Sequence, residues 1–448
     1  MICTSVILGA GHGKRMQSEL PKVLHSIAGL PLIEWALRVG SEACGRKPVV
    51  VVGPDAKQVR EMVGDRAVLV EQSERLGTGH AVQQAESVLQ GKSDLVLVTY
   101  ADMPLLSADT LRGLIELQEQ EQAALSMLTV LAEDPRGFGR ILRDANNQVA
   151  AIVEEADATL EQKKIRELNP GVYCFQADWL WDHLPLLKRS VSGEFYLTDL
   201  IAVAVAEGRK VAAFIAESRD ELIGVNTRVH LAEAEKAIRI RINTHWMHSG
   251  VTMIDPERTY IGADVTIGKD TILAPGCVLE GNTVIGEHTK LGPDTFVRDS
   301  HIGNRCEIRY SVIEHAILED DVDVGPFGHL RKGAHLKQGV HMGNFGEVKN
   351  STLESGVKMG HFSYIGDAEI HEDVNIGAGT VTCNFDGKHK HKTEVGAGAF
   401  IGSGTMLVAP IRLGQKSVTG AGSVVTREVA ENSVVVGVPA REMKKKSD

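Results

Sequence analysis

Residues 260–292 read YIGADVTIGKDTILAPGCVLEGNTVIGEHTKLG, and the repeat in this segment predicts the fold of the C-terminal half. Every sixth position is aliphatic, often with glycine directly after it, at Ile261, Ile267, Leu273, Leu279, Ile285 and Leu291. A strand alternates every two residues and a helix about every 3.6, so a period of six fits neither. The pattern predicts a triangular coil with three short strands per turn, one inward aliphatic side chain per strand, and glycine relieving steric conflict at tight corners.

The same register returns through most of the C-terminal half, at Val297, Leu318, Val324, Leu330, Leu336, Met342, Val348, Leu353, Met359, Ile365, Ile370, Ile376, Val395, Ile401, Leu407, Leu413, Thr419 and Val425. Coils of this kind stack about 4.8 Å apart and bury a continuous aliphatic column. The register breaks between Ile376 and Val395, where the segment 379–392 is polar and basic. We expect part of that segment to leave the wall as a loop.

The N-terminal half, residues 1–249, holds all four tryptophans and follows a different pattern. Short apolar runs predict buried strands at residues 5–8, 49–52, 67–70 and 95–98. Amphipathic segments between them predict helices at residues 32–39, 81–89 and 108–118. This alternation predicts a parallel sheet with helices on both faces, and ligands beyond the carboxyl ends of its strands. Helical spacing over 229–248 predicts a connecting helix that Gly250 ends.

Composition narrows the class of protein further. A chain of 448 residues is expected to form two domains, and a net charge of −11 argues against a general nucleic-acid binder. The sequence contains no apolar run near the roughly 18 residues of a membrane span, and its start lacks signal-peptide architecture. Six scattered cysteines without a Cys-x-x-Cys pair predict neither disulfides nor a zinc site, and favour the cytoplasm.

A glycine-rich loop follows the first predicted strand, in the order Leu8-Gly-Ala-Gly-His-Gly-Lys-Arg-Met16. Its glycines let backbone N–H groups approach phosphate oxygens, and positive charge comes from Lys14, Arg15 and Lys22. A plain turn is the alternative for so short a motif. A dinucleotide-binding loop is disfavoured because a third glycine is replaced by Lys-Arg and no acidic residue ends the next strand. The loop predicts a polyphosphate cradle of another kind.

Two groups of polar residues are candidates for chemistry. Asp102 follows a predicted buried strand and, with Asn226, offers the oxygen ligands that suit Mg²⁺; the alternatives are a helix cap near Ser107 and a turn residue. In the coil, His361 suits a general base for an amine nucleophile, because histidine is the residue type most often used to accept a proton near neutral pH. Its neighbours in sequence include Lys349, Tyr364 and Asn375, although a solvated histidine is the plainer reading.

On these motifs, together with Tyr100-Ala-Asp102 and the segment Asn384-Phe-Asp-Gly387, the whole chain resembles the bacterial bifunctional N-acetylglucosamine-1-phosphate uridyltransferase / glucosamine-1-phosphate N-acetyltransferase family. The resemblance implies an α/β chain with an N-terminal Rossmann-like nucleotidyltransferase domain over 1–228, a linker helix over 229–249, and a left-handed parallel β-helix of hexapeptide repeats over 250–448. It also implies a homotrimer assembled through the β-helix.

The resemblance assigns the N-terminal residues to the nucleotide sugar. The matching positions are Leu8, Gly9, Ala10, Gly11, Lys22, Gln72, Gly77, Thr78, Tyr100, Ala101, Asp102, Gly139, Glu154, Asn169 and Asn226. Among them, Gln72, Gly77 and Thr78 lie in the segment 71–80, which resembles the family's uracil-reading segment, and Gly139, Glu154 and Asn169 match its sugar-binding positions. Arg15 matches the pyrophosphate clamp, and Asp102 with Asn226 match the Mg²⁺ ligands. Gly9 and Lys14 depart from the alanine and threonine usual in the family's first loop.

In the coil, the resemblance makes His361 the general base and gives the sugar phosphate to Arg331, Lys349, Tyr364 and Asn375. It assigns acetyl-CoA contacts to Ala378, Asn384, Phe385, Ser403 and Ala421, with Arg441 as a looser match. Phe385 stands where the family commonly has tyrosine.

The implied function is the synthesis of UDP-N-acetylglucosamine in two steps, as a precursor for cell-wall and lipopolysaccharide synthesis. Acetyl-CoA first acetylates glucosamine 1-phosphate in the coil; the N-terminal domain then uses UTP and Mg²⁺ to uridylylate the product and release pyrophosphate. The expected partners are these small molecules, with no nucleic acid and no membrane. The alternative is a sugar-1-phosphate nucleotidyltransferase whose coil only regulates or oligomerises.

Overall fold

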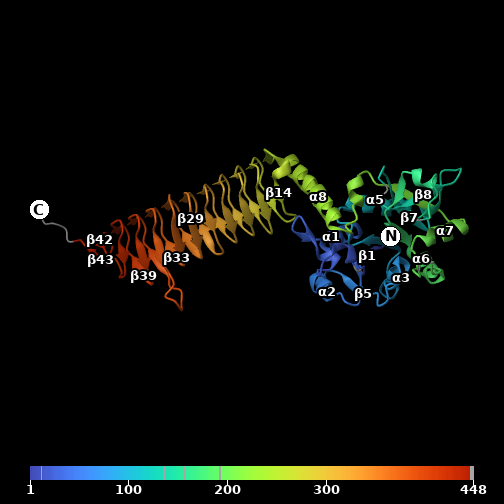
Figure 1. The fold of residues 1–448 in the computed structure, drawn as a ribbon, viewed down its shortest axis with the longest axis horizontal. Coiled ribbons are helices and arrows are strands. Elements are labelled where there is room, and N and C mark those ends of the chain that lie inside the picture. Colours follow the sequence, from blue (N-terminus) through green and yellow to red (C-terminus); the bar gives the residue numbers. More distant parts are fainter. Residues whose placement is uncertain (12, 135–136, 156, 191–192, 444–448) are drawn as a thin grey trace. The chain divides into compact units, whose positions relative to one another are not determined.

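The computed structural model describes residues 1–11, 13–134, 137–155, 157–190 and 193–443. Its contacts divide the chain into two compact units, Met1–Ile238 and Arg239–Asp448. The division falls within helix α8 (Arg228–His248). The presence of this helix confirms the helix predicted over 229–248. The first unit is an α/β domain and the second is a stacked coil of short strands (Figure 1).

One large sheet organises the first unit. Its strands run in the order β5-β4-β1-β6-β11-β7-β10-β8-β9, with β12 alongside β7. Their bounds are β1 (Cys3–Leu8), β4 (Val49–Val52), β5 (Val68–Glu71), β6 (Leu95–Tyr100), β7 (Leu125–Leu131), β8 (Gly139–Arg143), β9 (Val149–Val153), β10 (Glu167–Asn169), β11 (Tyr173–Gln176) and β12 (Val211–Ile215). A small antiparallel pair joins β2 (Ser26–Ile27) and β3 (Leu30–Pro31).

The prediction of a parallel sheet is wrong for part of this unit. Strands β5, β4, β1 and β6 are parallel, but β11 runs antiparallel to both β6 and β7, so the sheet is mixed. The prediction that residues 67–70 form a buried strand is also wrong. Strand β5 pairs only with β4 and lies at the edge of the sheet, which leaves Val68 43% exposed.

Helices cover both faces of the sheet, as predicted. On β1, Val6 packs in one apolar cluster with Ala81 and Val82, whereas the next residue, Ile7, packs in another with Ile33 and Leu37. Successive strand residues point to opposite faces, so both faces are buried. The helices are α1 (Leu32–Cys44), α2 (Lys57–Val63), α3 (Thr78–Gln83), α4 (Glu86–Leu89), α5 (Ala108–Glu121), α6 (Ala177–His183) and α7 (Asp199–Ala206). The single helix predicted over 81–89 is therefore two short ones.

The second unit is a three-sided parallel β-helix, which confirms the coil predicted from the period of six (Figure 1). The first face contains β13 (Thr252–Met253), β16 (Ile272–Leu273), β19 (Lys290–Leu291), β22 (Glu307–Ile308), β25 (Asp323–Val324), β28 (His341–Met342), β31 (Lys358–Met359), β34 (Asn375–Ile376), β37 (Phe400–Ile401), β40 (Val418–Thr419), β42 (Val434–Gly437) and the antiparallel β43 (Ala440–Glu442).

The second face contains β14 (Tyr260–Ile261), β17 (Val278–Glu280), β20 (Phe296–Arg298), β23 (Val312–Glu314), β26 (His329–Leu330), β29 (Gly346–Lys349), β32 (Ser363–Gly366), β35 (Val381–Cys383), β38 (Met406–Val408) and β41 (Val424–Val425). The third face contains β15 (Thr266–Ile267), β18 (Val284–Ile285), β21 (His301–Ile302), β24 (Ile317–Leu318), β27 (Ala334–Leu336), β30 (Ser351–Leu353), β33 (Ala368–Ile370), β36 (Thr393–Val395) and β39 (Ile411–Leu413).

The inward aliphatic column is continuous, including the part where the six-residue register lapses. Between Val297 and Leu318 the column is filled by Ile302, Ile308 and Ile313, which are all fully buried. Three of these repeat units have five residues, and each turns its corner on one non-glycine residue with positive φ: Asp299 (44°), Tyr310 (46°) and His315 (50°). A left-handed residue makes a tighter corner, so the register shortens without moving the inward side chain.

Glycine is required at some corners because neighbouring coils stack too closely there for a side chain. A Cβ on Gly286 would lie 2.5 Å from the carbonyl carbon of Gly303 on the next coil. At the start of the coil, Asn243 of α8 donates from Nδ2 to the carbonyls of Pro256 (2.8 Å) and Thr259 (3.0 Å). Ile242 and Trp246 pack beside the same end of the apolar column. The last part of α8 thus caps a repeat that would otherwise expose its core.

Among the described residues, no helix combines the length and the apolar character needed to cross a membrane.

Candidate active sites

A cavity of about 570 Å³ opens at the carboxyl ends of β1, β5 and β6 in the first unit. Ten of the residues predicted to bind the nucleotide sugar line it: Leu8, Gly9, Ala10, Gly11, Lys22, Gln72, Gly77, Thr78, Tyr100 and Asp102. They come from loops that are distant in sequence but follow neighbouring strands, as a parallel sheet requires. Ala101 lies fully buried between Tyr100 and Asp102.

The two predicted Mg²⁺ ligands converge on one point. The Lys22 ammonium contacts the Asp102 carboxylate and also lies 3.1 Å from the Asn226 Oδ1 atom. Arg15 donates from Nη2 to the same Asn226 oxygen at 3.0 Å. Asp102 is not the cap of α5, because Ser107 fills that role by accepting a hydrogen bond from the Thr110 N–H. A carboxylate and an amide oxygen aimed at one cation suit a magnesium ion that keeps waters and phosphates as its other ligands.

The part of the cavity predicted to read the base is held by internal hydrogen bonds. Gln72 is 3% exposed and donates from Nε2 to the Gly77 carbonyl at 3.0 Å, with His80 Nδ1 at 3.2 Å. Arg75 lines the same cavity and donates from Nε to the carbonyl of Ala10 at 2.7 Å. Sequence reasoning missed Arg75, although it lies inside the segment 71–80 that the resemblance had singled out.

The predicted sugar-binding residues meet beyond Tyr100. A Cβ on Gly139 would lie 3.5 Å from the Glu154 carboxylate, so these two positions are adjacent. Burial, reinforced by the nearby carboxylates of Asp157 and Asp199, raises the pKa of Glu154. Burial also raises the pKa of Tyr100, with further contributions from the charges of Asp102 and Glu154. Asp102 and Glu154 are therefore both close enough to Tyr100 to affect its ionisation.

Asn169 is committed to a local network. Its side chain exchanges hydrogen bonds with the Tyr173 hydroxyl, at 2.7 and 3.0 Å, and accepts one from the Gly171 N–H at 3.1 Å. Gly171 in turn packs against the Tyr100 ring, because a Cβ there would lie 3.0 Å from a ring carbon. Asn169 therefore shapes the wall that carries Tyr100.

In the coil, one column of predicted residues runs along the corner between the first and second faces. The strand register pairs Met359 with Ile376, Ile376 with Ile401, and Ile401 with Thr419. The residue two positions after each of these is a predicted site residue: His361, Ala378, Ser403 and Ala421. We call this column the base corner; its members follow one another at strand spacing, about 4.8 Å per coil.

The surroundings of the base corner fit the prediction for His361. Its Nδ1 lies 3.2 Å from the Oδ1 of Asn344, which occupies the same corner one coil earlier, and the ring is solvent-exposed. Asn375 is on the adjoining first face, paired with Lys358 and Phe400. Arg441 lies on β43 opposite Val436, which packs over Gly420 beside Ala421.

The other predicted residues gather at the opposite edge of the second face. Arg331 and Lys349 each follow an inward residue of that face, and Arg331 pairs with Glu347 at 2.8 Å. The Tyr364 hydroxyl points to this edge, because a Cβ on Gly366 would lie 2.3 Å from it and 2.8 Å from Asn384 Nδ2. Phe385 follows Asn384 and is 60% exposed. We call this group the phosphate edge.

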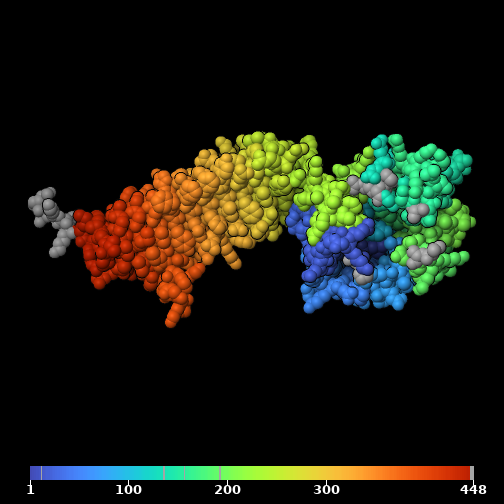
Figure 2. Space-filling view, in the orientation of Figure 1, coloured from blue at the N-terminus to red at the C-terminus, as the bar shows by residue number. Residues whose placement is uncertain are grey.

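A loop adds a third cation to the phosphate edge. The predicted excursion is confirmed and stands out from the coil as the orange-red protrusion in Figure 2. Interaction with the Lys390 side chain on it, together with the charge of Arg331, lowers the pKa of Lys349. Three cations at one edge are suited to a phosphate dianion.

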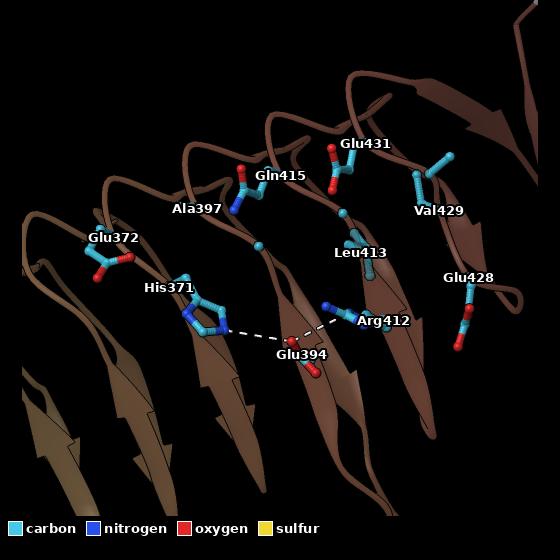
Figure 3. Close-up of a pocket in the computed structure, with 13 residues that line it drawn as sticks. His371, Glu372, Glu394, Ala397, Arg412, Leu413, Gln415, Glu428, Val429 and Glu431 are labelled. Atoms are coloured by element: carbon cyan, nitrogen blue, oxygen red, sulfur yellow. Dashed lines mark ion pairs between the residues drawn. The ribbon is translucent and has the colours of Figure 1, made fainter.

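A separate groove of about 390 Å³ lies on the coil between the third and first faces (Figure 3). Glu394 at its centre pairs with His371 at 3.7 Å and with Arg412 at 3.4 Å. The described residues that line this groove include none of the predicted site residues. It is an ion-paired surface apart from both candidate sites.

Fold and sites together define a nucleotidyltransferase joined to a hexapeptide-repeat transferase. Residues 5–169 match the MobA-like NTP transferase domain, and residues 264–299 match the bacterial transferase hexapeptide (six repeats). The coil is thus a left-handed parallel β-helix of hexapeptide repeats, as expected from the resemblance.

Curated relatives are similar over nearly the whole chain. The chain is 45% identical over 434 residues to the bifunctional protein GlmU of Heliobacterium modesticaldum, covering 97% of this chain and 95% of that protein. It is 44% identical to bifunctional protein GlmU of Trichlorobacter lovleyi (97% and 95% covered) and 43% identical to that of Geobacillus sp. WCH70 (99% and 96% covered). The chain belongs to the bifunctional GlmU family. Membership confirms the prediction of a bifunctional transferase that makes UDP-N-acetylglucosamine in two steps.

Proposed function

We propose that the two reactions are divided between the two units, with acetylation in the coil and uridylylation in the α/β domain. The observation that carries this division is the presence of two separate constellations, each with its own chemistry. The 570 Å³ cavity offers a phosphate cradle with converging Asp102 and Asn226 oxygens. The coil offers an exposed imidazole at His361 and a triple-cation edge.

In the coil, His361 takes a proton from the amine of glucosamine 1-phosphate as its nitrogen attacks the thioester carbonyl of acetyl-CoA. The new C–N bond replaces the C–S bond, and coenzyme A leaves as its thiol. Arg331 and Lys349 hold the sugar phosphate, Tyr364 and Asn375 orient the sugar, and acetyl-CoA follows the base corner. A base with pKa near neutrality contributes about 10²–10⁴-fold in reactions of this type.

In the α/β domain, a phosphate oxygen of N-acetylglucosamine 1-phosphate attacks the α-phosphorus of UTP, and the bond to the β-phosphate breaks to release pyrophosphate. Arg15 and Lys22 bind and neutralise the phosphates, Gly139 and Glu154 face the sugar, and Asn169 shapes the wall beside it. Asp102 and Asn226 would hold Mg²⁺, which when bound neutralises charge that develops on the leaving group. Positioning and electrostatics are sufficient here, so no general base is required.

We also propose that the working form is a homotrimer through the β-helix and that it is cytoplasmic. In a single chain, the base corner and the phosphate edge lie on opposite edges of the second face, and a neighbouring copy would bring one chain's corner towards another's edge. The cytoplasm suits the six free cysteines and is where UTP and acetyl-CoA are supplied.

The test uses the full chain in two reactions. One contains glucosamine 1-phosphate, acetyl-CoA, UTP and Mg²⁺; the other contains N-acetylglucosamine 1-phosphate, UTP and Mg²⁺. We expect UDP-N-acetylglucosamine by mass spectrometry in both. Product in the second reaction only would favour the alternative, in which the coil does not catalyse, and product in neither would overturn the proposal.

A further inference from the structure

The loop that leaves the coil between Asn384 and Lys392 is closed around a single carboxylate. Asp386 Oδ1 accepts hydrogen bonds from the backbone N–H groups of Lys388 (2.8 Å) and His389 (2.7 Å). Its Oδ2 lies 2.7 Å from the Nε2 of His391. The Asp386 N–H also donates to the His389 carbonyl at 3.1 Å. We call these four residues the Asp386 latch.

Both ends of the loop are fixed to the coil. The His391 N–H donates to the Asn384 carbonyl at 2.8 Å, and Lys392 pairs with Glu369 at 2.6 Å. Asn384 in turn donates to the Asp367 carboxylate at 2.5 Å. The feet of the loop are therefore set by the wall, and only its tip needs its own support.

That support does not come from an apolar core. A hollow of about 390 Å³ separates the loop from the coil, and charged side chains from the loop line it at Lys390, His391 and Lys392. Phe385 is 60% exposed. Backbone N–H groups and the His391 ring hold the pKa of Asp386 well below its usual range, which agrees with an ionised acceptor at the centre of the loop. Polar bonds to Asp386 fix the conformation of the tip.

The latch has a consequence for the phosphate edge. Lys390 lies within the latched segment, where it pairs with Phe385 across the loop, and it lines the hollow beside the coil together with Asn350, the residue after Lys349. Its interaction with Lys349 lowers the pKa of that lysine. Two like charges repel, so an unrestrained loop would swing Lys390 away. We propose that Asp386 is a positioning residue for acetyl transfer: through the latch it holds Lys390 beside Lys349 before the phosphate of the sugar substrate arrives. This inference rests on the proposed acetyltransferase function of the coil.

The test compares Asp386→Ala and Asp386→Asn with the unaltered chain. Removing the carboxylate in Asp386→Ala loosens the tip of the loop, which must then become ordered when the substrate binds. We therefore expect KM for glucosamine 1-phosphate to rise about tenfold, with kcat within about twofold of that of the unaltered chain. Asparagine keeps an oxygen for the two backbone N–H groups, so Asp386→Asn should stay within about threefold of the unaltered KM. The matched control is Asp323→Ala, which removes a carboxylate paired with His341 elsewhere on the coil and should leave KM unchanged.

Hydrogen exchange gives a second readout that does not depend on activity. In Asp386→Ala the amides of Lys388 and His389 should exchange faster, while those of β35 and β36 stay protected. An unchanged KM, an equal rise in Asp323→Ala, or unchanged exchange at these two amides would overturn the inference. If the unaltered chain fails to acetylate, the proposed function itself fails, which the same assay distinguishes.

Discussion

The two units assemble their candidate sites in different ways. In the α/β domain, loops after neighbouring parallel strands converge at one sheet edge, so residues as distant in sequence as Leu8 and Asp102 line one cavity. In the β-helix, each coil repeats the last, so site residues form columns along corners, and the base corner and phosphate edge stay on opposite edges of one face. A converging sheet concentrates functional groups within one chain, whereas a solenoid distributes them and relies on loops and neighbouring copies to complete a site.

Removing divalent metal should distinguish the activities of the two units most completely. With EDTA in excess over Mg²⁺, we expect uridylylation to stop, because Asp102 and Asn226 alone leave the triphosphate charge uncompensated. Acetylation, which uses His361 and protein cations, should continue at its full rate. Coenzyme A release and pyrophosphate release, followed in parallel, measure the two. Equal loss of both would contradict the division.

Replacing the proposed base should produce the opposite loss. In His361→Ala we expect the acetylation kcat to fall about 10³-fold, as for loss of a general base, with uridylylation unchanged. His371→Ala is the control, since His371 lies on the same coil, is partly exposed, and pairs with Glu394 (Figure 3). Retained acetylation in His361→Ala, or loss in the control, would refute the role of His361.

A core substitution tests whether the coil's stability depends on its inward column. Leu330→Ala should lower the free energy of unfolding of the coil by about 2–5 kcal/mol, because Leu330 is fully buried and its neighbours cannot fill the space. Ile317→Ala, at a position 48% exposed on the third face, should cost less than about 0.5 kcal/mol. Denaturant unfolding followed by circular dichroism provides the comparison. Equal effects of the two would contradict the assignment of inward and outward positions.

Arg75 offers a smaller effect within the nucleotide cavity. Arg75→Ala removes the hydrogen bond to the Ala10 carbonyl, worth about 1 kcal/mol net, so KM for UTP should rise about fivefold. Arg60→Ala, which breaks an exposed ion pair with Glu71, should leave KM unchanged. Steady-state uridylylation kinetics measure KM for UTP in both variants. An unchanged KM in Arg75→Ala would show that the glycine-rich loop does not depend on this hydrogen bond.

The smallest effect concerns pH. Because burial raises the pKa of Glu154, its protonation begins at a higher pH than for an ordinary glutamate, and the ionised acceptor is lost as pH falls. KM for N-acetylglucosamine 1-phosphate should therefore rise about two- to threefold as pH is lowered towards the usual glutamate range, about 4.3. Glu154→Gln cannot ionise and should flatten this dependence. A rise of equal size in Glu154→Gln would assign it to another group.

The positions that sequence alone identified correctly depend on local rules. The period of six follows from the geometry of one short strand and one corner, so it could be read without knowing the neighbours, and each aliphatic position of that register is buried. The same holds for the loop after residue 383 and for the segments around Leu8 and Asp102, which belong to strand ends. Whether His361 acts as the base stays a prediction that the substitution above will test.

Other features depend on contacts between distant segments, and they become visible only in the folded chain. Strand β5 is exposed because it lies at the edge of the sheet. The sheet is mixed because β11 pairs with β6 in the antiparallel direction. The five-residue units turn on residues such as Asp299 and Tyr310, whose positive φ no periodicity reveals. Folding also brings Arg75 to the Ala10 carbonyl. It brings Lys390 close to Lys349 in the same way. Period and local turn chemistry are properties of a few adjacent residues, whereas edges, corners and charge clusters exist only once separate segments meet.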